Sequence, residues 1–232
     1  MLTLVIPWRP QPSRVDALDR VVAWYRSRFD EIDIRLVDSR DEIFNLAQCR
    51  NLGVASVEDP DRVLVINDAD TIPETEPLRA AIAAASGSGL VHLPYTQYRW
   101  LGSAGTAQFA AGVPLADCEY ELVQGACSGV YVTTPRTWAR HGGQDERFRG
   151  WGFEDAAWYL AHGTLLGQPP HRHEGRVFAL HHVAAAREGE QYELNAAHMK
   201  RYREAAENPA AMAQLIGLSA DSAENARTLP GS

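Results

Sequence analysis

The sequence lacks any long apolar run, and this absence excludes the usual kinds of helical membrane protein. No window of the 232 residues approaches the roughly 20 consecutive apolar side chains with which a helix crosses a bilayer. The first residues, Met1 to Ile6, also lack the basic start and long apolar core of a secretory signal peptide. We therefore expect no transmembrane segment and a cytoplasmic location.

Cysteine is scarce as well. The chain has three cysteines, Cys49, Cys118 and Cys127, which are odd in number and far apart in the sequence. Such a set excludes a disulfide framework and a zinc knuckle. We expect reduced thiols with a structural role.

Positive charge is short too, because 22 Lys and Arg face 30 Asp and Glu for a net charge of −8. This balance disfavours binding driven by nucleic-acid phosphates. A local basic patch in one segment stays open, although a solvated helix face is the favoured interpretation of its four arginines, Arg136, Arg140, Arg147 and Arg149.

What the chain does have is the composition of a globular protein, 45% hydrophobic and 22% charged. Its first half alternates predicted strands with predicted helices: strands at 2–6, 32–37 and 63–66, helices at 14–29 and about 41–57. The run 63–66 is apolar at every position, which is typical of a parallel strand covered on both faces. We predict an α/β fold with a mostly parallel central sheet flanked by helices, whose first ~90 residues form a nucleotide-binding βαβαβ half.

The second half is less regular. Residues 99–117 are rich in Gly and Ala without a clear period, which predicts a long loop or insertion. A strand at 128–132 and a helix capped by Thr134 with Pro135 follow, then a short helix after Asp155, a strand at 176–180 and a helix from about 191. No repeat or linker is evident, so we expect one domain with a partly mobile tail after Pro209.

The strongest local feature is the run Asn67-Asp68-Ala69-Asp70 at the end of the buried strand 63–66. Two carboxylates separated by one residue can point at one spot and hold a hard divalent cation, which can bridge a diphosphate. A solvated turn is the alternative. The apolar Ile72-Pro73 that follows is unusual for such a turn.

A second feature is Gly150-Trp151-Gly152-Phe153-Glu154-Asp155. The indole suits stacking on a sugar, and the two acids can supply a base and a hydroxyl-binding partner. The alternative is a buried Trp followed by a helix start with acidic residues.

Histidines form a third feature. An imidazole of His181 or His182, after the last strand, can complete the metal site, or serve as a structural residue. The earlier run His171-Arg172-His173 is interpreted as a solvated loop.

The order of these features resembles that of metal-dependent GT-A-fold glycosyltransferases, above all the β-1,4-galactosyltransferase family. The matching runs are Ile6-Pro7-Trp8-Arg9, Phe44-Asn45-Leu46-Ala47 with Asn51-Leu52-Gly53, Asp68-Ala69-Asp70-Thr71-Ile72-Pro73, Ser128-Gly129-Val130 and Gly150 to Asp155. The last run is also similar to one in polypeptide N-acetylgalactosaminyltransferases and chondroitin-type polymerases.

The resemblance implies a GT-A-type domain at 1–208, with a nucleotide-sugar half at 1–90 and an acceptor half at 91–208, before a tail at 209–232. It implies a UDP-sugar donor, Mn²⁺ or Mg²⁺, and transfer of a hexose of the galactose or N-acetylhexosamine type. The acceptor would carry a hydroxyl: a glycan, a glycoside, a protein or, less favoured, modified DNA.

The resemblance also assigns roles to single residues. Uridine and diphosphate contacts fall to Pro7, Trp8, Arg9 and Phe44, and Asp68 would lie near the ribose. Ala69 is a further nucleotide-sugar contact, and Asp38 is a candidate base or ribose contact. Metal ligands would be Asp70 and Asp68 with one of His181 or His182. Trp151 and Gly152 would lie beside donor and acceptor, Glu154 would hold the acceptor hydroxyl, and Asp155 would be the general base. A base opposite the leaving group predicts inversion at the anomeric carbon.

Departures from the family pattern leave alternatives open. Phe153 replaces a glycine, the family's Met-x-x-His is absent, and its donor-selecting tyrosine has no secure counterpart near Tyr95-Thr96-Gln97-Tyr98 or Gly125. A retaining transferase of the same fold and a glycan-binding module without turnover stay open. A sugar nucleotidyltransferase is disfavoured, because Pro7-Trp8-Arg9-Pro10 stands where a Gly-rich loop would follow the first strand.

Overall fold

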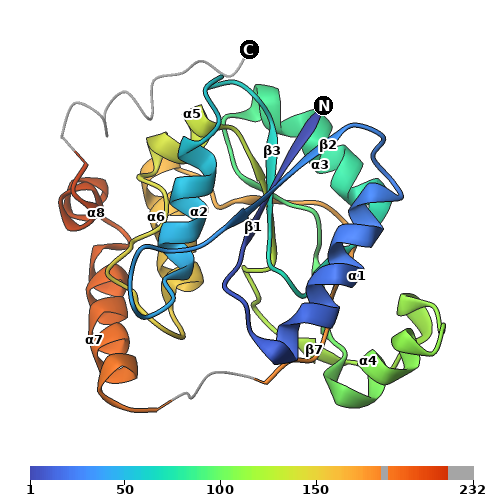
Figure 1. The fold of residues 1–232 in the computed structure, drawn as a ribbon. Helices are drawn as coiled ribbons and strands as arrows, with labels where there is room; N and C mark the ends of the chain where they lie inside the picture. The colour runs from blue at the N-terminus through green and yellow to red at the C-terminus, as the bar shows by residue number, and fades with distance from the viewer. Residues whose placement is uncertain (184–187, 219–232) are drawn as a thin grey trace.

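The computed structural model describes residues 1–183 and 188–218, and its centre is a six-stranded sheet in the order β2-β1-β3-β8-β5-β9 (Figure 1). Three of its five neighbouring pairs, β2 with β1, β1 with β3 and β5 with β9, are parallel. The predicted α/β class with a mostly parallel central sheet is confirmed. The strands are β1 (Leu2–Pro7), β2 (Ile32–Val37), β3 (Leu64–Asn67), β5 (His92–Leu93), β8 (Val130–Thr133) and β9 (His171–Arg172).

The three parallel strands of the first half end at one edge of this sheet. Pro7 of β1 is in register with Val37 of β2, and Val5 of β1 with Ile66 of β3. The loops that follow these strands therefore open on the same side, as in other parallel α/β folds that bind ligands.

Helices cover both faces of the sheet (Figure 1). α1 (Val15–Arg26) and α3 (Thr75–Ser88) lie on one side, and α2 (Leu46–Ala55), α5 (Pro135–Arg140) and α6 (Glu154–Leu166) on the other. α5 begins with Thr134 as N-cap, whose side chain accepts from the Thr137 amide, and Pro135 at its first position, as predicted.

Helix α2 is shorter than the predicted helix over about 41–57. The Asn45 side chain accepts a hydrogen bond from the Gln48 amide and so caps the helix there. Residues 41–45 therefore belong to the loop after β2. Within α2, a Cβ on Gly53 would lie 2.1 Å from a Val5 methyl carbon, so only glycine allows this close approach of helix and strand.

A second, four-stranded sheet lies beside the first, in the order β4-β10-β6-β7. Its strands are β4 (Thr71–Pro73), β6 (Gln97–Trp100), β7 (Glu121–Val123) and β10 (Arg176–Ala179). Of the two predictions for 99–117, a long loop or an insertion, the long loop was wrong, because this stretch contains α4 (Gly102–Ala110) and a 3-10 turn (Leu115–Asp117). Another 3-10 turn, Pro12–Arg14, leads into α1.

The C-terminal helices α7 (Glu190–Ala205) and α8 (Pro209–Ile216) pack with α6 around a second apolar cluster. Met212 and Ala213 of α8 are buried there, so the prediction of a mobile tail from Pro209 was wrong for 209–216. The rest of the predicted tail, 219–232, lies outside the described residues.

Two predictions made from scarcity can be checked on the described residues. Cys49 and Cys118 are buried, Cys127 is half-buried, and all three are unbridged thiols, as predicted. No helix within 1–183 and 188–218 has the length and apolar character that crossing a bilayer requires.

Candidate active site

A cleft of about 480 Å³ opens at the carboxyl ends of β1 and β3. Ten of the residues singled out from the sequence line it: Pro7, Phe44, Asp68, Ala69, Asp70, Trp151, Gly152, Glu154, Asp155 and His182. Segments that are distant in the sequence meet here, because the loops after β1, β2 and β3 face the start of α6. Four predicted residues do not line the cleft: Trp8, Arg9, Asp38 and His181.

The guanidinium of Arg50 lies beneath the cleft and is fully buried. It donates to Asp68 Oδ1 at 2.7 Å, to Asp155 Oδ1 at 2.5 Å and to Gln144 Oε1 at 2.8 Å. Its face also lies 4.9 Å from the centre of the Tyr131 ring. One buried cation thus joins the aspartate after β3 to the aspartate at the start of α6.

Asp155 is held at one oxygen. Its Oδ1 accepts hydrogen bonds from Arg50 and the Tyr131 hydroxyl, with the Gln144 amide at 3.4 Å. Among the described residues, every hydrogen bond of this carboxylate ends on Oδ1. The carboxylate lines the cleft with its orientation fixed, which is the arrangement a positioned base needs.

Asp70 forms the other polar centre of the cleft. Its Oδ2 lies 2.7 Å from Arg14 Nη2 and 2.9 Å from His182 Nε2. Burial would raise the pKa of Asp70, but the hydrogen bond from His182 and the charge of Arg14 hold it below its usual value. The hydrogen bond to Asp70 in turn raises the pKa of His182.

The structure distinguishes the two adjacent histidines. His182 contacts Asp70, and its Nδ1 lies 2.9 Å from the Val183 carbonyl oxygen, which leaves Nε2 on the side of the carboxylate. His181 is exposed, its ring stands near Trp100, and its amide donates to Thr106. Of the two histidines, only His182 is therefore placed to bind the same metal ion as Asp70.

The remaining two acids of the cleft are shifted in the opposite direction to Asp70. Burial, with repulsion from Asp155, raises the pKa of Glu154 to about 8. Burial also raises the pKa of Asp68, against the attraction of Arg50. Glu154 is thus held in its neutral form near pH 7.

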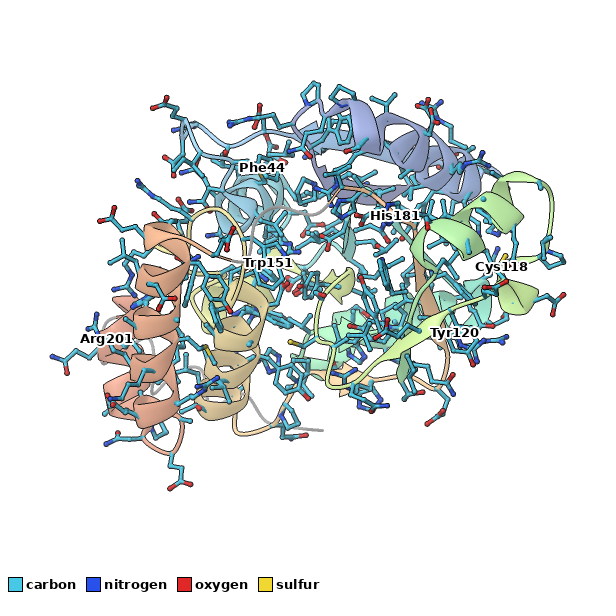
Figure 2. All side chains as sticks on the ribbon, turned by 90° about the horizontal axis from the view of Figure 1, so that it is seen from below. Phe44, Cys118, Tyr120, Trp151, His181 and Arg201 are labelled. Carbon is cyan, nitrogen blue, oxygen red and sulfur yellow. The ribbon has the colours of Figure 1, made fainter. Side chains whose placement is uncertain are left out.

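Aromatic rings form one wall of the cleft. The Trp151 ring stacks on Tyr192 of α7 with centroids 6.1 Å apart, and Phe153 lies 5.2 Å from the same ring. Trp151 is 38% exposed, and Figure 2 shows it near the middle of this side of the molecule, below Phe44. Asn195 fixes the loop by donating to the carbonyl oxygens of Arg149 and Trp151.

Phe153 has a backbone φ of 76°, the one positive φ of a non-glycine residue in 1–183 and 188–218. This left-handed conformation is easy for glycine, the residue at this position in the family that the sequence resembles. Phe153 adopts it immediately before Glu154, the first residue of α6. Its ring therefore occupies cleft wall that a glycine would leave open.

Known structures provide a comparison for this architecture. No protein-family model and no curated protein sequence matches the chain. Among solved structures, the catalytic domain of Drosophila β1,4-galactosyltransferase 7 in complex with xylobiose is similar over 84% of this chain and 79% of its own, at 14% identity and a TM-score of 0.55. GalNAc-T7 with UDP, GalNAc and Mn²⁺ is similar over 90% of this chain and 50% of its own, at 10% identity and a TM-score of 0.61.

The chain has a GT-A-type fold. A mutant of the same Drosophila enzyme, in a complex with manganese, UDP-Gal and xylobiose, is similar at 15% identity over 84% of this chain and 78% of its own, with a TM-score of 0.54. Identities of 10–15% are evidence for the fold alone, so the roles of residues in this GT-A-type chain rest on its own geometry.

Three sequence assignments change in that geometry. Arg9 donates through Nε to Asp38 and through both Nη atoms to loop carbonyls of Ser39, Asp41 and Glu42. Its guanidinium lies 5.5 Å from the Phe44 ring, so it shapes the loop that carries Phe44 and does not face the cleft. Asp38 forms an ion pair with Arg9, and Trp8 packs on the hydrophobic core.

Arg14 and Arg50 are the charged residues that sequence reasoning missed. Arg50 stands beside the Asn51-Leu52-Gly53 run, and a lone charge on the buried face of α2 was the available signal. Arg14 precedes α1, and the sequence carries no comparable signal for it.

The four arginines between 136 and 149 form no open basic patch. Arg136 pairs with Asp61, Arg147 with Asp145 and Arg149 with Asp41. Arg140 donates to the Gly89 carbonyl oxygen. Of these arginines only Arg136 and Arg140 stand on a helix, α5, so the predicted solvated helix face holds for that part alone.

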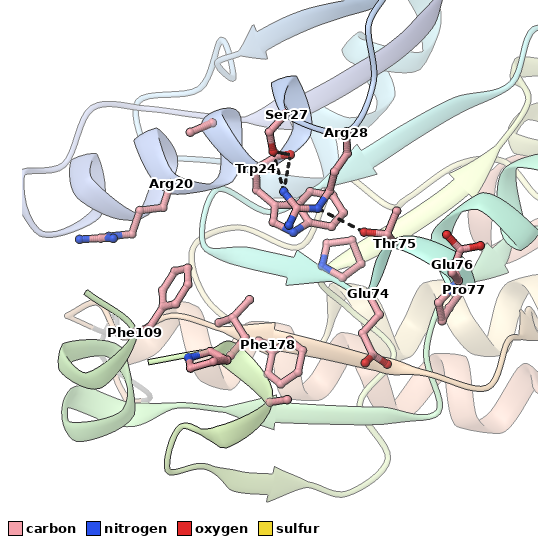
Figure 3. Close-up of a pocket in the computed structure, with 15 residues that line it drawn as sticks. Arg20, Trp24, Ser27, Arg28, Glu74, Thr75, Glu76, Pro77, Phe109 and Phe178 are labelled. Carbon is pink, nitrogen blue, oxygen red and sulfur yellow. Dashed lines mark hydrogen bonds between the residues drawn. The ribbon is translucent and has the colours of Figure 1, made fainter. Parts of the chain in front are cut away.

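A larger cavity, of about 850 Å³, lies between α1, α4 and β4 (Figure 3). Arg28 donates to Thr75 there, and the Glu74 carboxylate is paired with Arg176. None of the predicted site residues lines it. Ten of them line the smaller cleft instead.

Proposed function

We propose that this chain is a metal-dependent glycosyltransferase that moves a hexose from a UDP-sugar to a hydroxyl acceptor. The observation that carries the proposal is the paired arrangement in one cleft: Arg50 fixes Asp68 and Asp155, and Asp70 faces His182. The similarity to Drosophila β1,4-galactosyltransferase 7 and GalNAc-T7 supports it at the level of the fold. We further propose a cytoplasmic location and a single transferase domain with donor and acceptor halves.

The donor set of the cleft fits a manganese or magnesium ion. Carboxylate oxygens of Asp70 and Asp68 are the ligands that these hard cations prefer, and the imidazole of His182 would add one nitrogen ligand. His182 Nε2 is 2.9 Å from Asp70 Oδ2, so the two groups can share one ion. When bound, the ion would neutralise charge on the donor diphosphate.

Arg14 supplies the protein's own positive charge at this end of the cleft. Its Nη2 lies 2.7 Å from Asp70, and it lines the cleft where Arg9 does not. Arg14 is therefore the arginine that we assign to the diphosphate, since a fixed cation stabilises the charge that develops on leaving oxygens.

Asp155 acts as the general base in this proposal. The acceptor oxygen attacks C1 of the donor sugar, the bond from C1 to the diphosphate oxygen breaks, and the acceptor proton passes to Asp155. Because Arg50 and Tyr131 hold Oδ1, the second oxygen, Oδ2, is assigned as the proton acceptor. Attack opposite the leaving group gives inversion at the anomeric carbon.

The other cleft residues bind substrate. Pro7 and Phe44 wall the uridine end, and Asp68 and Ala69 lie next to the ribose. Neutral Glu154 donates or accepts a hydrogen bond with the acceptor hydroxyl, as its pKa of about 8 permits. Trp151 provides the flat face for the acceptor sugar, and Gly152 leaves room beside it.

The test is release of UDP from a panel of UDP-sugars with and without Mn²⁺ and a mixture of glycoside acceptors. We expect Mn²⁺-dependent release that Asp155→Asn lowers by about 10²–10⁴-fold, the usual contribution of a general base. UDP affinity in the same variant should be unchanged. Asp61→Asn, in an exposed ion pair, is the matched control.

Absence of UDP binding in the presence of Mn²⁺ would contradict the assignment of the donor site. Binding without turnover for every donor and acceptor would instead favour a glycan-binding module. Loss of UDP binding together with turnover in Asp155→Asn would show a structural role for that residue.

A further inference from the structure

Three histidines gather at the edge of the central sheet, in a place that the proposed transfer reaction does not use. His92 lies on β5 and is buried, and its register partner on the parallel edge strand β9 is His171. His173 follows β9, and its amide donates to the Leu93 carbonyl oxygen. Residues i and i+2 of an extended strand point to the same face, so His171 and His173 share a face with His92.

The run His171-Arg172-His173 was predicted to be a solvated loop, and the structure shows an ordered cluster instead. Its rings pack with centroids 4.9–5.1 Å apart. One ring nitrogen from each histidine lies within 4.8 Å of the other two. The shortest of these contacts joins His92 Nδ1 to His173 Nε2 at 2.8 Å.

The nitrogen–nitrogen distances of a metal site lie between these two values, 2.8 Å and 4.8 Å. A tetrahedral zinc ion with Zn–N bonds of about 2.0–2.1 Å holds pairs of ligand nitrogens roughly 3.3 Å apart. The pair at 2.8 Å needs to open slightly and the third ring to move inward, which exposed His171 can do by side-chain rotation. The pairing of β5 with β9 already places His92 beside His171, so the backbone does not have to move.

A neighbouring hydroxyl orients the central ligand. Ser88 Oγ lies 2.6 Å from His92 Nε2. Metal-binding imidazoles typically use their second nitrogen in such a contact, which fixes the ring and leaves the first nitrogen for the ion. Burial, with repulsion from His173 and His171, lowers the pKa of His92 to about 4, so its ring is neutral near pH 7.

We propose that His92, His171 and His173 bind one divalent transition-metal ion of the zinc class, with the fourth position open to water. The site is separate from the catalytic cleft, which none of the three histidines lines. An all-imidazole set favours Zn²⁺ over Mn²⁺ and Mg²⁺, which prefer oxygen ligands such as those of Asp68 and Asp70. A bound metal ion would cross-link β5 to the short edge strand β9 and so stabilise their pairing.

The experiment measures Zn²⁺ binding to the metal-stripped full chain, produced without a histidine tag, by calorimetry and by the visible spectrum of a Co²⁺ substitute. We expect one equivalent of tetrahedral Co²⁺ absorption from the three histidines, and the same absorption in Asp70→Asn, in which the cleft has lost a metal ligand. His171→Ala removes an exposed ligand and should lower Zn²⁺ affinity by more than about 100-fold, since even loss of an orienting partner costs 10–100-fold. Ser88→Ala, which removes the orienting hydroxyl, should lower Zn²⁺ affinity by about 10–100-fold.

Two controls separate this site from the cleft. His181→Ala removes an exposed histidine outside the cluster and should leave Zn²⁺ affinity unchanged. Asp70→Asn should also leave it unchanged while weakening Mn²⁺-dependent UDP binding, so failure of the zinc site and failure of the proposed transferase are distinguishable.

Equal Zn²⁺ affinity in the native chain and in His171→Ala, or no binding by the native chain, overturns the proposal. Circular dichroism of each variant checks the fold, and His173→Ala serves as the second ligand variant should His171→Ala unfold. Its expected loss is the same, because it removes one of the same three nitrogens.

Discussion

The guanidinium of Arg50 lies 2.7 Å from the carboxylate of Asp68 and holds Asp155 with its other nitrogen. Arg50 is fully buried, whereas both carboxylates are partly exposed to the cleft. The buried guanidinium thereby offsets the repulsion between two acids that line one cleft. This shared ion pair explains how Asp68, after β3, and Asp155, at the start of α6, stay close together although both are largely buried.

Removing this cation tests its role. Arg50→Ala leaves the two aspartates without their partner, and breaking a buried ion pair in this way typically costs about 3–5 kcal/mol of unfolding free energy. Arg50→Lys keeps the charge but not the planar fork, so it should lose less stability and still lose most turnover. Urea denaturation and UDP release measure the two effects.

Arg136→Ala is the control for that comparison, because Arg136 forms an exposed ion pair with Asp61. It should change stability little, as exposed pairs do. A stability loss in Arg50→Ala no larger than in Arg136→Ala would contradict the role given to Arg50.

The adjacent histidines provide a second, matched pair of variants. His182→Ala should raise the Mn²⁺ concentration for half-maximal UDP binding by at least about 10-fold, because it removes the imidazole beside Asp70. His181→Ala should leave that concentration unchanged. A titration of UDP binding with Mn²⁺ makes the measurement, and an equal effect of the two substitutions would contradict the ligand assignment.

How much of this site was predictable depends on the range of the interactions. Asp68, Asp70 and Trp151 were predicted because each stands in a short run next to a strand end or a helix start, where local sequence fixes the position. Arg50 bonds Asp155 across 105 positions of sequence, and no local pattern encodes that partner. The same holds for Arg14, which meets Asp70 across 56 positions.

The fold shows the same division. The buried strand β3 was predictable from four consecutive apolar residues, whereas α4 was not. Gly105 of α4 is buried against the chain at Glu119, and a Cβ there would lie 2.0 Å from the Glu119 carbonyl oxygen, so only glycine fits. A glycine that permits close packing looks in sequence like a loop residue. Helix α8 has Asn208 as its cap and Pro209 as its first residue. Its apolar face is buried by α6 and α7, a tertiary contact that the local sequence does not reveal.

A third prediction concerns pH. The pKa of Glu154 in the folded chain is raised from 4.5 to about 8, so folding takes up a proton in between. The stabilising contribution is complete below about pH 4.5 and is lost as pH rises toward 8, by at most about 1.4 kcal/mol per pH unit. Glu154→Gln, which stays neutral, should remove this dependence.

Urea denaturation of both proteins between pH 5 and pH 8 makes the comparison. The difference in unfolding free energy between Glu154→Gln and the native chain should grow with pH, and this difference cancels the contributions of the other acids. A difference that is constant with pH, or that shrinks, would show that Glu154 is ionised in the folded state.

The last prediction follows from the backbone of Phe153, whose φ is 76°. Phe153→Ala and Phe153→Gly both remove the ring that packs 5.2 Å from Tyr192, so they lose the same contact. They differ in the left-handed conformation, which costs an L-residue about 1–2 kcal/mol and glycine little. Because glycine loses more entropy on folding, the net expectation is that Phe153→Gly is more stable than Phe153→Ala by about 1 kcal/mol. Denaturation of the pair measures this, and an alanine variant at least as stable as the glycine variant would show that the loop before Glu154 relaxes out of the left-handed region.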